Sequence, residues 1–152
     1  MDRNEVELTA YCGLYCGDCI RYKAKLSDLA REMCEELKRA HFAEYATAKS
    51  AFFSEFKHYR ESVLLLKRIG DLKCDTPCSL GGDGCAEPCE IKKCVHSKRI
   101  EGCWECAEFE QCGRFEFLKP FHGDGPKKNL RKIREYGLEG WALHREKCYP
   151  WL

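Results

Sequence analysis

Several features that mark other classes of protein are missing from this 152-residue chain. No stretch approaches the roughly 18 consecutive apolar residues of a membrane-spanning helix. The first ten residues lack the positive region and apolar run of a secretory leader. A surplus of either charge is also missing, because 26 Lys and Arg face 25 Asp and Glu, which leaves a formal charge of +1. These absences disfavour a membrane or nucleic acid as partner, and they predict a cytoplasmic protein.

Cysteine, in contrast, is abundant, with 13 in the chain. Disulfides belong mainly to secreted proteins, whereas the cytoplasm keeps thiols reduced. An odd count also prevents complete pairing. The composition therefore favours thiolates that bind metal. A disulfide framework is the alternative if a leader has been removed, and plain buried thiols are a third interpretation.

The densest cysteine region runs from residue 74 to residue 112 and holds eight cysteines in 39 residues. Gly and Pro separate them, without an amphipathic period. Such a segment cannot bury enough apolar surface to offset the entropy of ordering its backbone, so we expect an irregular segment that is cross-linked by metal. The candidate ligands in it are Cys74, Cys78, Cys85, Cys89, Cys94, Cys103, Cys106 and Cys112.

A second cysteine motif, CxxxCxxC, lies near the N-terminus and consists of Cys12, Cys16 and Cys19. Three thiolates leave one position open on a tetrahedral zinc ion, which a distant Cys or His must then fill. The same spacing occurs in radical S-adenosylmethionine enzymes, where a small molecule completes a four-iron cluster. Those enzymes need a large partial barrel, which this chain is too short to supply.

The two motifs together provide eleven candidate thiolates. Two tetrahedral sites would use eight of them, and three sites would use all eleven with one imidazole from His96 or His122. Spacing identifies pairs of ligands but not the way in which pairs combine. Because a zinc ion with four thiolates carries about −2, two such sites would bring the protein to roughly −3, which further disfavours DNA binding.

The rest of the chain has helical periodicity. Apolar residues at steps of three and four predict a helix over residues 20–40 and another over 50–69, joined near 41–49 as an antiparallel hairpin. Phe53, Leu64 and Leu65 widen the apolar face of the second helix, and we expect this face to be buried. Cys34 fits the pattern of the first helix as a small core residue.

Beyond the cysteines, Pro126 and Gly137 are typical of the first and last positions of a helix. The basic residues of that helix are expected to face solvent, and a last short helix is expected over 138–147. We predict a single, mainly α domain with little strand, in which the hairpin packs on an irregular, cysteine-rich, metal-binding lobe and on C-terminal helices. Its parts are a cysteine knuckle (1–19), a helical lobe (20–70), the cysteine-rich lobe (71–113) and the C-terminal helices (114–152).

The order of these motifs resembles a small prokaryotic cysteine-rich family, domain of unknown function 3795. The resemblance is carried by residues 11–19, 89–94 and 102–112, followed by Asn129-Leu130, Ile133, Gly137 and Trp141. It implies a cytoplasmic protein that binds zinc and has no assigned activity. The family usually has a proline where this chain has Gln111.

The hypothesis favoured by these patterns is a zinc protein with two or three structural ions that presents a surface to another protein. Closed thiolate shells leave no position for a substrate, and no nucleophile and base stand together in the sequence. The alternatives are an iron–sulfur protein in electron transfer, a metal-dependent or redox enzyme with an open site at Cys12, Cys16 and Cys19, and, least favoured, nucleic-acid binding by a zinc-ribbon-like surface. The sequence does not determine the oligomeric state.

Overall fold

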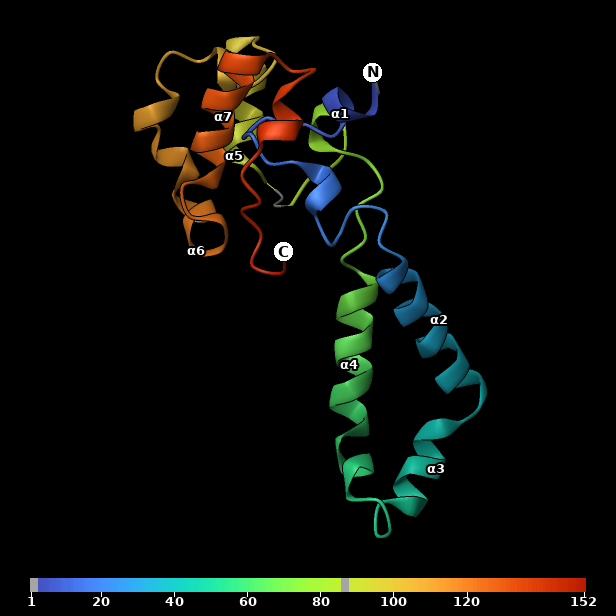
Figure 1. Ribbon diagram of the computed structural model, residues 1–152. Helices are drawn as coiled ribbons and strands as arrows, with labels where there is room; N and C mark the ends of the chain where they lie inside the picture. The colour runs from blue at the N-terminus through green and yellow to red at the C-terminus, as the bar shows by residue number, and fades with distance from the viewer. Residues whose placement is uncertain (1–2, 86–87) are drawn as a thin grey trace. The chain divides into compact units, whose positions relative to one another are not determined.

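Helices supply most of the regular structure in the computed structural model (Figure 1), which describes residues 3–85 and 88–152. Extended pairing among these residues is limited to two isolated bridges, Thr9 with Tyr15 and Tyr22 with Cys74. The prediction of a mainly helical chain with little strand is confirmed. The chain divides into two compact units, a helical unit (Lys23–Lys73) and a cysteine-rich unit formed by the chain up to Tyr22 together with Cys74–Leu152.

The helical unit contains α2 (Lys25–Arg39), α3 (Phe42–Lys49) and α4 (Tyr59–Gly70), with a 3-10 turn over Ser54–His58 before α4. Helices α2 and α4 lie side by side and antiparallel, and α3 lies towards the tip of the hairpin (Figure 1). The two long helices are shorter than predicted, but their periodicity was interpreted correctly.

The connection between these helices differs from the prediction. Residues 41–49 were expected to be a linker, but they form α3 after a reversal at His41, whose φ of 51° is left-handed. Helix α3 then contributes Phe42, whose ring contacts Phe56 and Tyr59 with centroids 5.7 Å apart in each case. A long-range aromatic cluster therefore stabilises a helix too short to be recognised by its period alone.

The interior of the helical unit is made largely of small side chains, among them Ser27, Ala30 and Ala46, all of which are buried. The predicted burial of the wide apolar face of α4 is wrong, because Leu64 and Leu65 are each 61% exposed. Phe52 and Phe53, which precede the 3-10 turn, are exposed as well. A hairpin of two long helices covers only the facing stripe of each, so apolar residues outside that stripe stay in solvent.

The cysteine-rich unit has short helices linked by 3-10 turns. Its α-helices are α1 (Arg3–Glu7), α5 (Glu90–Lys98), α6 (Lys119–His122) and α7 (Gly125–Tyr136). The helix predicted from Pro126 to Gly137 is confirmed as α7. The last predicted helix, over 138–147, is reduced to a 3-10 turn at Trp141–His144.

The core of this unit is formed by large side chains from distant parts of the sequence, with Trp141 and Leu130 fully buried. Helix α5 lies inside the segment that was expected to be irregular and without a core. It buries Ile91 and Val95, one turn apart, and Phe109 follows them into the same core. The expectation was wrong because two residues of one helix face are enough to join a core that other segments complete.

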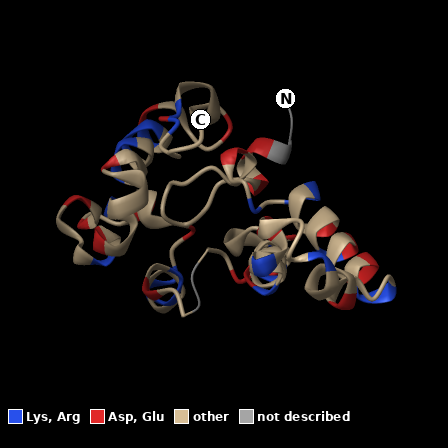
Figure 2. Cartoon of the chain, turned by 90° about the horizontal axis from the view of Figure 1, so that it is seen from below, with Lys and Arg blue, Asp and Glu red and all other residues tan. Residues whose placement is uncertain are grey.

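Acidic and basic residues are interspersed along the helices of the chain (Figure 2), as the nearly equal counts require. Among the described residues, no helix has both the length and the apolar character needed to cross a bilayer.

Candidate metal centres

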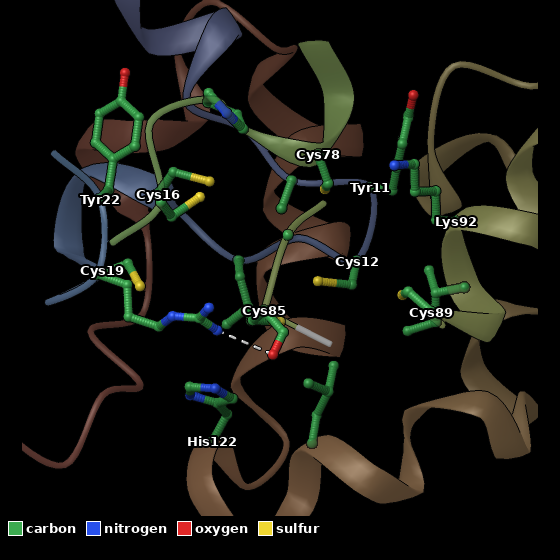
Figure 3. Close-up of a pocket in the computed structure, with 18 of the residues that line it drawn as sticks. Tyr11, Cys12, Cys16, Cys19, Tyr22, Cys78, Cys85, Cys89, Lys92 and His122 are labelled. Carbon is green, nitrogen blue, oxygen red and sulfur yellow. Dashed lines mark hydrogen bonds between the residues drawn. The ribbon is translucent and has the colours of Figure 1, made fainter. Parts of the chain in front are cut away.

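The eleven cysteines predicted as ligands line two cavities of the cysteine-rich unit. The first, here the seven-cysteine cavity, is lined by Cys12, Cys16, Cys19, Cys74, Cys78, Cys85 and Cys89 (Figure 3). The second, the four-cysteine cavity, is lined by Cys94, Cys103, Cys106 and Cys112. Spacing alone did not group these residues, and the tertiary structure does.

The seven-cysteine cavity has a volume of about 130 Å³ and collects cysteines from three separate segments of the chain. The segments are tied to one another by the backbone and side chain of Arg21. The carbonyl oxygen of Arg21 accepts a hydrogen bond from the Cys74 amide at 2.8 Å, and its guanidinium donates to the carbonyl of Cys85 at 3.1 Å (Figure 3).

The loop that carries Cys12 and Cys16 is held against α7. Gly13 adopts a φ of +83°, and a Cβ at this position would lie 2.7 Å from the carbonyl oxygen of Pro126, so both the conformation and the close approach require glycine. The fully buried Asn129 donates from Nδ2 to the carbonyl of Gly13 at 2.9 Å and accepts from the Glu146 amide at 2.7 Å.

The C-terminal segment fixes the same loop from another side. Arg145 forms a bidentate ion pair with Asp18, with nitrogen–oxygen distances of 2.7 and 2.8 Å. The Tyr149 hydroxyl donates to the carbonyl of Tyr15 at 3.1 Å. Residues more than 120 positions downstream in the chain therefore position the CxxxCxxC motif, which no local pattern could show.

The knuckle of the four-cysteine cavity, Cys103 to Cys106, is held by Arg134 of α7. Its guanidinium donates to the carbonyl oxygens of Trp104 at 2.6 Å and Cys106 at 2.8 Å, and it lies 4.5 Å from the centroid of the Phe109 ring. The sequence interpretation of the basic residues of α7 as a solvated face missed this contact. The contact could have been anticipated from the sequence, because Arg134 follows the apolar Leu130 by one helical turn and so lies on the same side of the helix.

Cations also lie next to the sulfurs of this cavity, whose volume is about 350 Å³. Lys98 Nζ is 3.3 Å from Sγ of Cys106 and 2.9 Å from the carboxylate of Glu108. Arg114 hydrogen-bonds with Cys112, and this bond raises the pKa of the Arg114 guanidinium. Positive charge is thus available where thiolates would accumulate negative charge.

Burial and mutual proximity act together on the thiols themselves. Burial, followed by the charge of Cys78, raises the pKa of Cys16 to about 12. Burial and then the neighbouring Cys112 raise the pKa of Cys103 to about 12. Burial also raises the pKa of Cys12 well above its ordinary value. Thiols whose pKa is raised in this way stay protonated at neutral pH. A bound metal ion favours the thiolate form instead, because its positive charge compensates for the negative charge of the thiolates.

The thiols share cavities without forming a complete coordination geometry. Within residues 3–85 and 88–152, no three Cys, His, Asp or Glu side chains converge closely enough to hold a metal ion. Ligand groups of metal-dependent domains commonly reach their final distances only when the ion binds. The assignment of these eleven cysteines as ligands stays a prediction.

The two histidines considered as ligands lie in different surroundings. His122, the last residue of α6, lines the seven-cysteine cavity (Figure 3). His96, on α5, lines neither cavity, and its Nε2 is 3.2 Å from the hydroxyl oxygen of Tyr11. Of the remaining thiols, Cys34 lies in α2 of the helical unit, and Cys148 packs against Gly125.

The fold and the cavities together define a helical, cysteine-rich protein whose thiols are collected from distant segments. The chain belongs to the family described as Protein of unknown function (DUF3795), whose sequence profile matches residues 8–117. The resemblance seen in the cysteine motifs is thereby confirmed. The matched range contains all eleven candidate ligands and ends before His122. No curated protein and no solved structure matches the chain.

Proposed function

We propose that this chain is a zinc-binding protein whose ions are structural, and that it serves as a protein-interaction or regulatory module. The observation that carries the proposal is the sorting of eleven cysteines into two cavities, one of them lined by four. Four thiolates are the number that closes a tetrahedral shell around zinc. A closed shell leaves no position for a substrate, so a structural role is favoured over a catalytic one.

The cations at the four-cysteine cavity support this proposal. A zinc ion with four thiolates carries about −2, and an uncompensated charge of that size is costly beside an apolar core. Lys98 and Arg114 each hydrogen-bond with one of the four cysteines. Both therefore stabilise the ionised ligands more than the protonated ones.

All thirteen cysteines lie within the described residues, and each is a free thiol. This state supports a location in the reducing cytoplasm. A protein partner is supported by the helical unit, where Leu26, Leu29 and Met33 recur at steps of three and four along α2 and are each about half exposed. An apolar stripe of this kind fits the surface of another protein better than that of a nucleic acid.

Elemental analysis of anaerobically purified protein tests the proposal. We expect zinc in two or three equivalents per chain, little iron, and loss of zinc when Cys103 and Cys106 are both replaced by Ser. Replacement of Cys34 by Ser is the matched control, because Cys34 lies outside both cavities. Protein that contains no metal, or that keeps all its zinc in the double variant, would refute the proposal.

An iron–sulfur protein in electron transfer is the second candidate. It is favoured by the volume of the four-cysteine cavity, about 350 Å³, which exceeds the space of a single ion. The hydrogen bond from Lys98 to the sulfur of Cys106 is also of the kind that tunes the reduction potential of a cluster. Absorption near 400 nm, on the order expected for sulfur-to-iron charge transfer, would favour this candidate over zinc.

A further inference from the structure

The number of sulfurs in the seven-cysteine cavity poses a question of stoichiometry. Seven thiolates are one donor short of the eight that two closed tetrahedral shells require. A single ion with four thiolates would leave the other three unused. Two ions need one further ligand, or else one thiolate that bridges both.

His122 is placed to be that ligand. It lines the cavity, and in Figure 3 its ring lies at the edge of the group of cysteines, below Cys85. Nδ1 is 2.9 Å from the carbonyl oxygen of Cys148. Because a carbonyl can only accept, Nδ1 carries the proton and the lone pair of the neutral ring is on Nε2. The imidazole therefore offers Nε2 as its donor atom.

The surroundings of His122 also hold the ring in one orientation. Tyr149 packs edge-on against it with ring centroids 4.9 Å apart. A hydrogen bond from the second ring nitrogen to a carbonyl is the usual way in which proteins orient a histidine that binds zinc. His96 also packs edge-on against a tyrosine, Tyr11, with ring centroids 5.6 Å apart. Its Nε2, however, contacts the hydroxyl of Tyr11, and the residue does not line the cavity.

We infer that the seven-cysteine cavity holds two zinc ions, one bound by four thiolates and the other by three thiolates and Nε2 of His122. The inference rests on the proposed function and deepens it, because it sets the total at three ions per chain. It also gives α6 a role that its four residues do not otherwise explain: the helix carries a ligand from the C-terminal part of the chain to the N-terminal cysteines.

Cadmium substitution tests this ligand set directly, because the ¹¹³Cd resonance position reports the number of coordinating thiolates. For the full-length protein loaded with ¹¹³Cd, we expect three resonances per chain, two typical of four thiolates and one typical of three thiolates and one imidazole. The variant H122A should lose the mixed-ligand resonance and bind two ions. The variant H122C should bind three again, all with resonances of the four-thiolate type.

The variant H96A is the matched control and should leave all three resonances unchanged. Three bound ions in H122A with the spectrum of the natural protein would overturn the inference and indicate a bridging thiolate, while leaving the zinc proposal intact. A natural protein that binds neither zinc nor cadmium would overturn both. The rescue by H122C separates loss of a ligand from failure to fold, because a misfolded variant would not recover the third ion.

Discussion

The helical unit and the cysteine-rich unit bury their side chains in different ways. Helix α2 pairs with α4 along one stripe, and the contacts join residues of two long helices through small side chains such as Ala30. The cysteine-rich unit has α-helices of four to twelve residues, and its core forms around Trp141 and Leu130 from segments far apart in the sequence.

The difference extends to the chemistry of the two units. Twelve of the thirteen cysteines, all but Cys34, are in the cysteine-rich unit. All three tryptophans, Trp104, Trp141 and Trp151, are there as well. One unit is therefore organised by helix period, and the other by long-range ties and, as we propose, by metal. Each unit also has its own spectroscopic signal, which allows the comparison to be tested.

Removal of metal should have the largest effect and should separate the two units. We expect a chelator to abolish the fixed tertiary signal of the tryptophans, while much of the helical signal of α2 and α4 in far-ultraviolet circular dichroism persists. The reason is that structural zinc contributes about 10 kcal/mol or more to the folding of small domains. A tryptophan signal that survives complete removal of metal would contradict the proposed dependence.

Truncation of the central tryptophan is expected to come next. Trp141 is fully buried, and its Nε1 donates to Oγ1 of Thr9 at 2.9 Å. The variant Trp141→Ala should lower the free energy of unfolding of the metal-loaded protein by about 3–5 kcal/mol, because it leaves a cavity and removes the hydrogen bond that the Thr9 hydroxyl accepts. Urea denaturation followed by the fluorescence of the other tryptophans measures this change.

The matched substitution in the helical unit is Leu65→Ala, at a side chain that is 61% exposed. It should change the free energy of unfolding by less than about 0.5 kcal/mol, measured by circular dichroism. Equal losses in the two variants would mean that the exposed face of α4 is covered in solution, and the contrast between the units would then be weaker than the structure indicates.

Two glycines test the close packing of the CxxxCxxC loop. Ala at Gly13 would meet the carbonyl of Pro126 at 2.7 Å in addition to adopting a positive φ. We expect Gly13→Ala to cost about 3 kcal/mol, from strain and overpacking together. Gly81 also has a positive φ but open space around it, so Gly81→Ala should cost only about 1 kcal/mol. Similar midpoints of urea unfolding for the two variants would argue against the tight contact.

Loss of the ion pair between Asp18 and Arg145 should have a smaller effect than the substitution at Gly13. The two side chains are 10% and 22% exposed. The variant Asp18→Asn should lower the free energy of unfolding by about 2 kcal/mol, because it leaves the guanidinium without its full counter-charge. In the helical unit, Glu36 pairs with Arg39 in solvent, and Glu36→Gln should leave the urea midpoint unchanged. If Glu36→Gln lowered the free energy of unfolding as much as Asp18→Asn, the conclusion that stabilising ion pairs are confined to the cysteine-rich unit would be contradicted.

The parts of the fold that follow from local chemistry were predictable. The period of apolar residues indicated α2 and α4, and Pro126 and Gly137 marked the ends of α7. Helix α3 was missed because its stability comes from the contacts of Phe42 with the rings of α4 and the turn before it. Helix α5 was missed because Gly, Pro and Cys on either side of it hid a face of only two buried residues.

For the candidate site, spacing selected eleven cysteines as candidate ligands but did not show how they are grouped. Cys89 and Cys94 are five residues apart, yet they line different cavities, whereas Cys12 and Cys89 line the same one. The sequence likewise did not distinguish His96 from His122, and of these two only His122 lines one of the two cavities.

The sequence by itself determined the helical character of the chain, its family and the set of thiols available, because each depends on residue type and on short-range period or spacing. Only the tertiary structure decided which thiols face the same space and which side chains hold them there. Those contacts join residues up to 134 positions apart, as between Tyr15 and Tyr149. Contacts at that separation depend on how the whole core packs, and no local pattern records it.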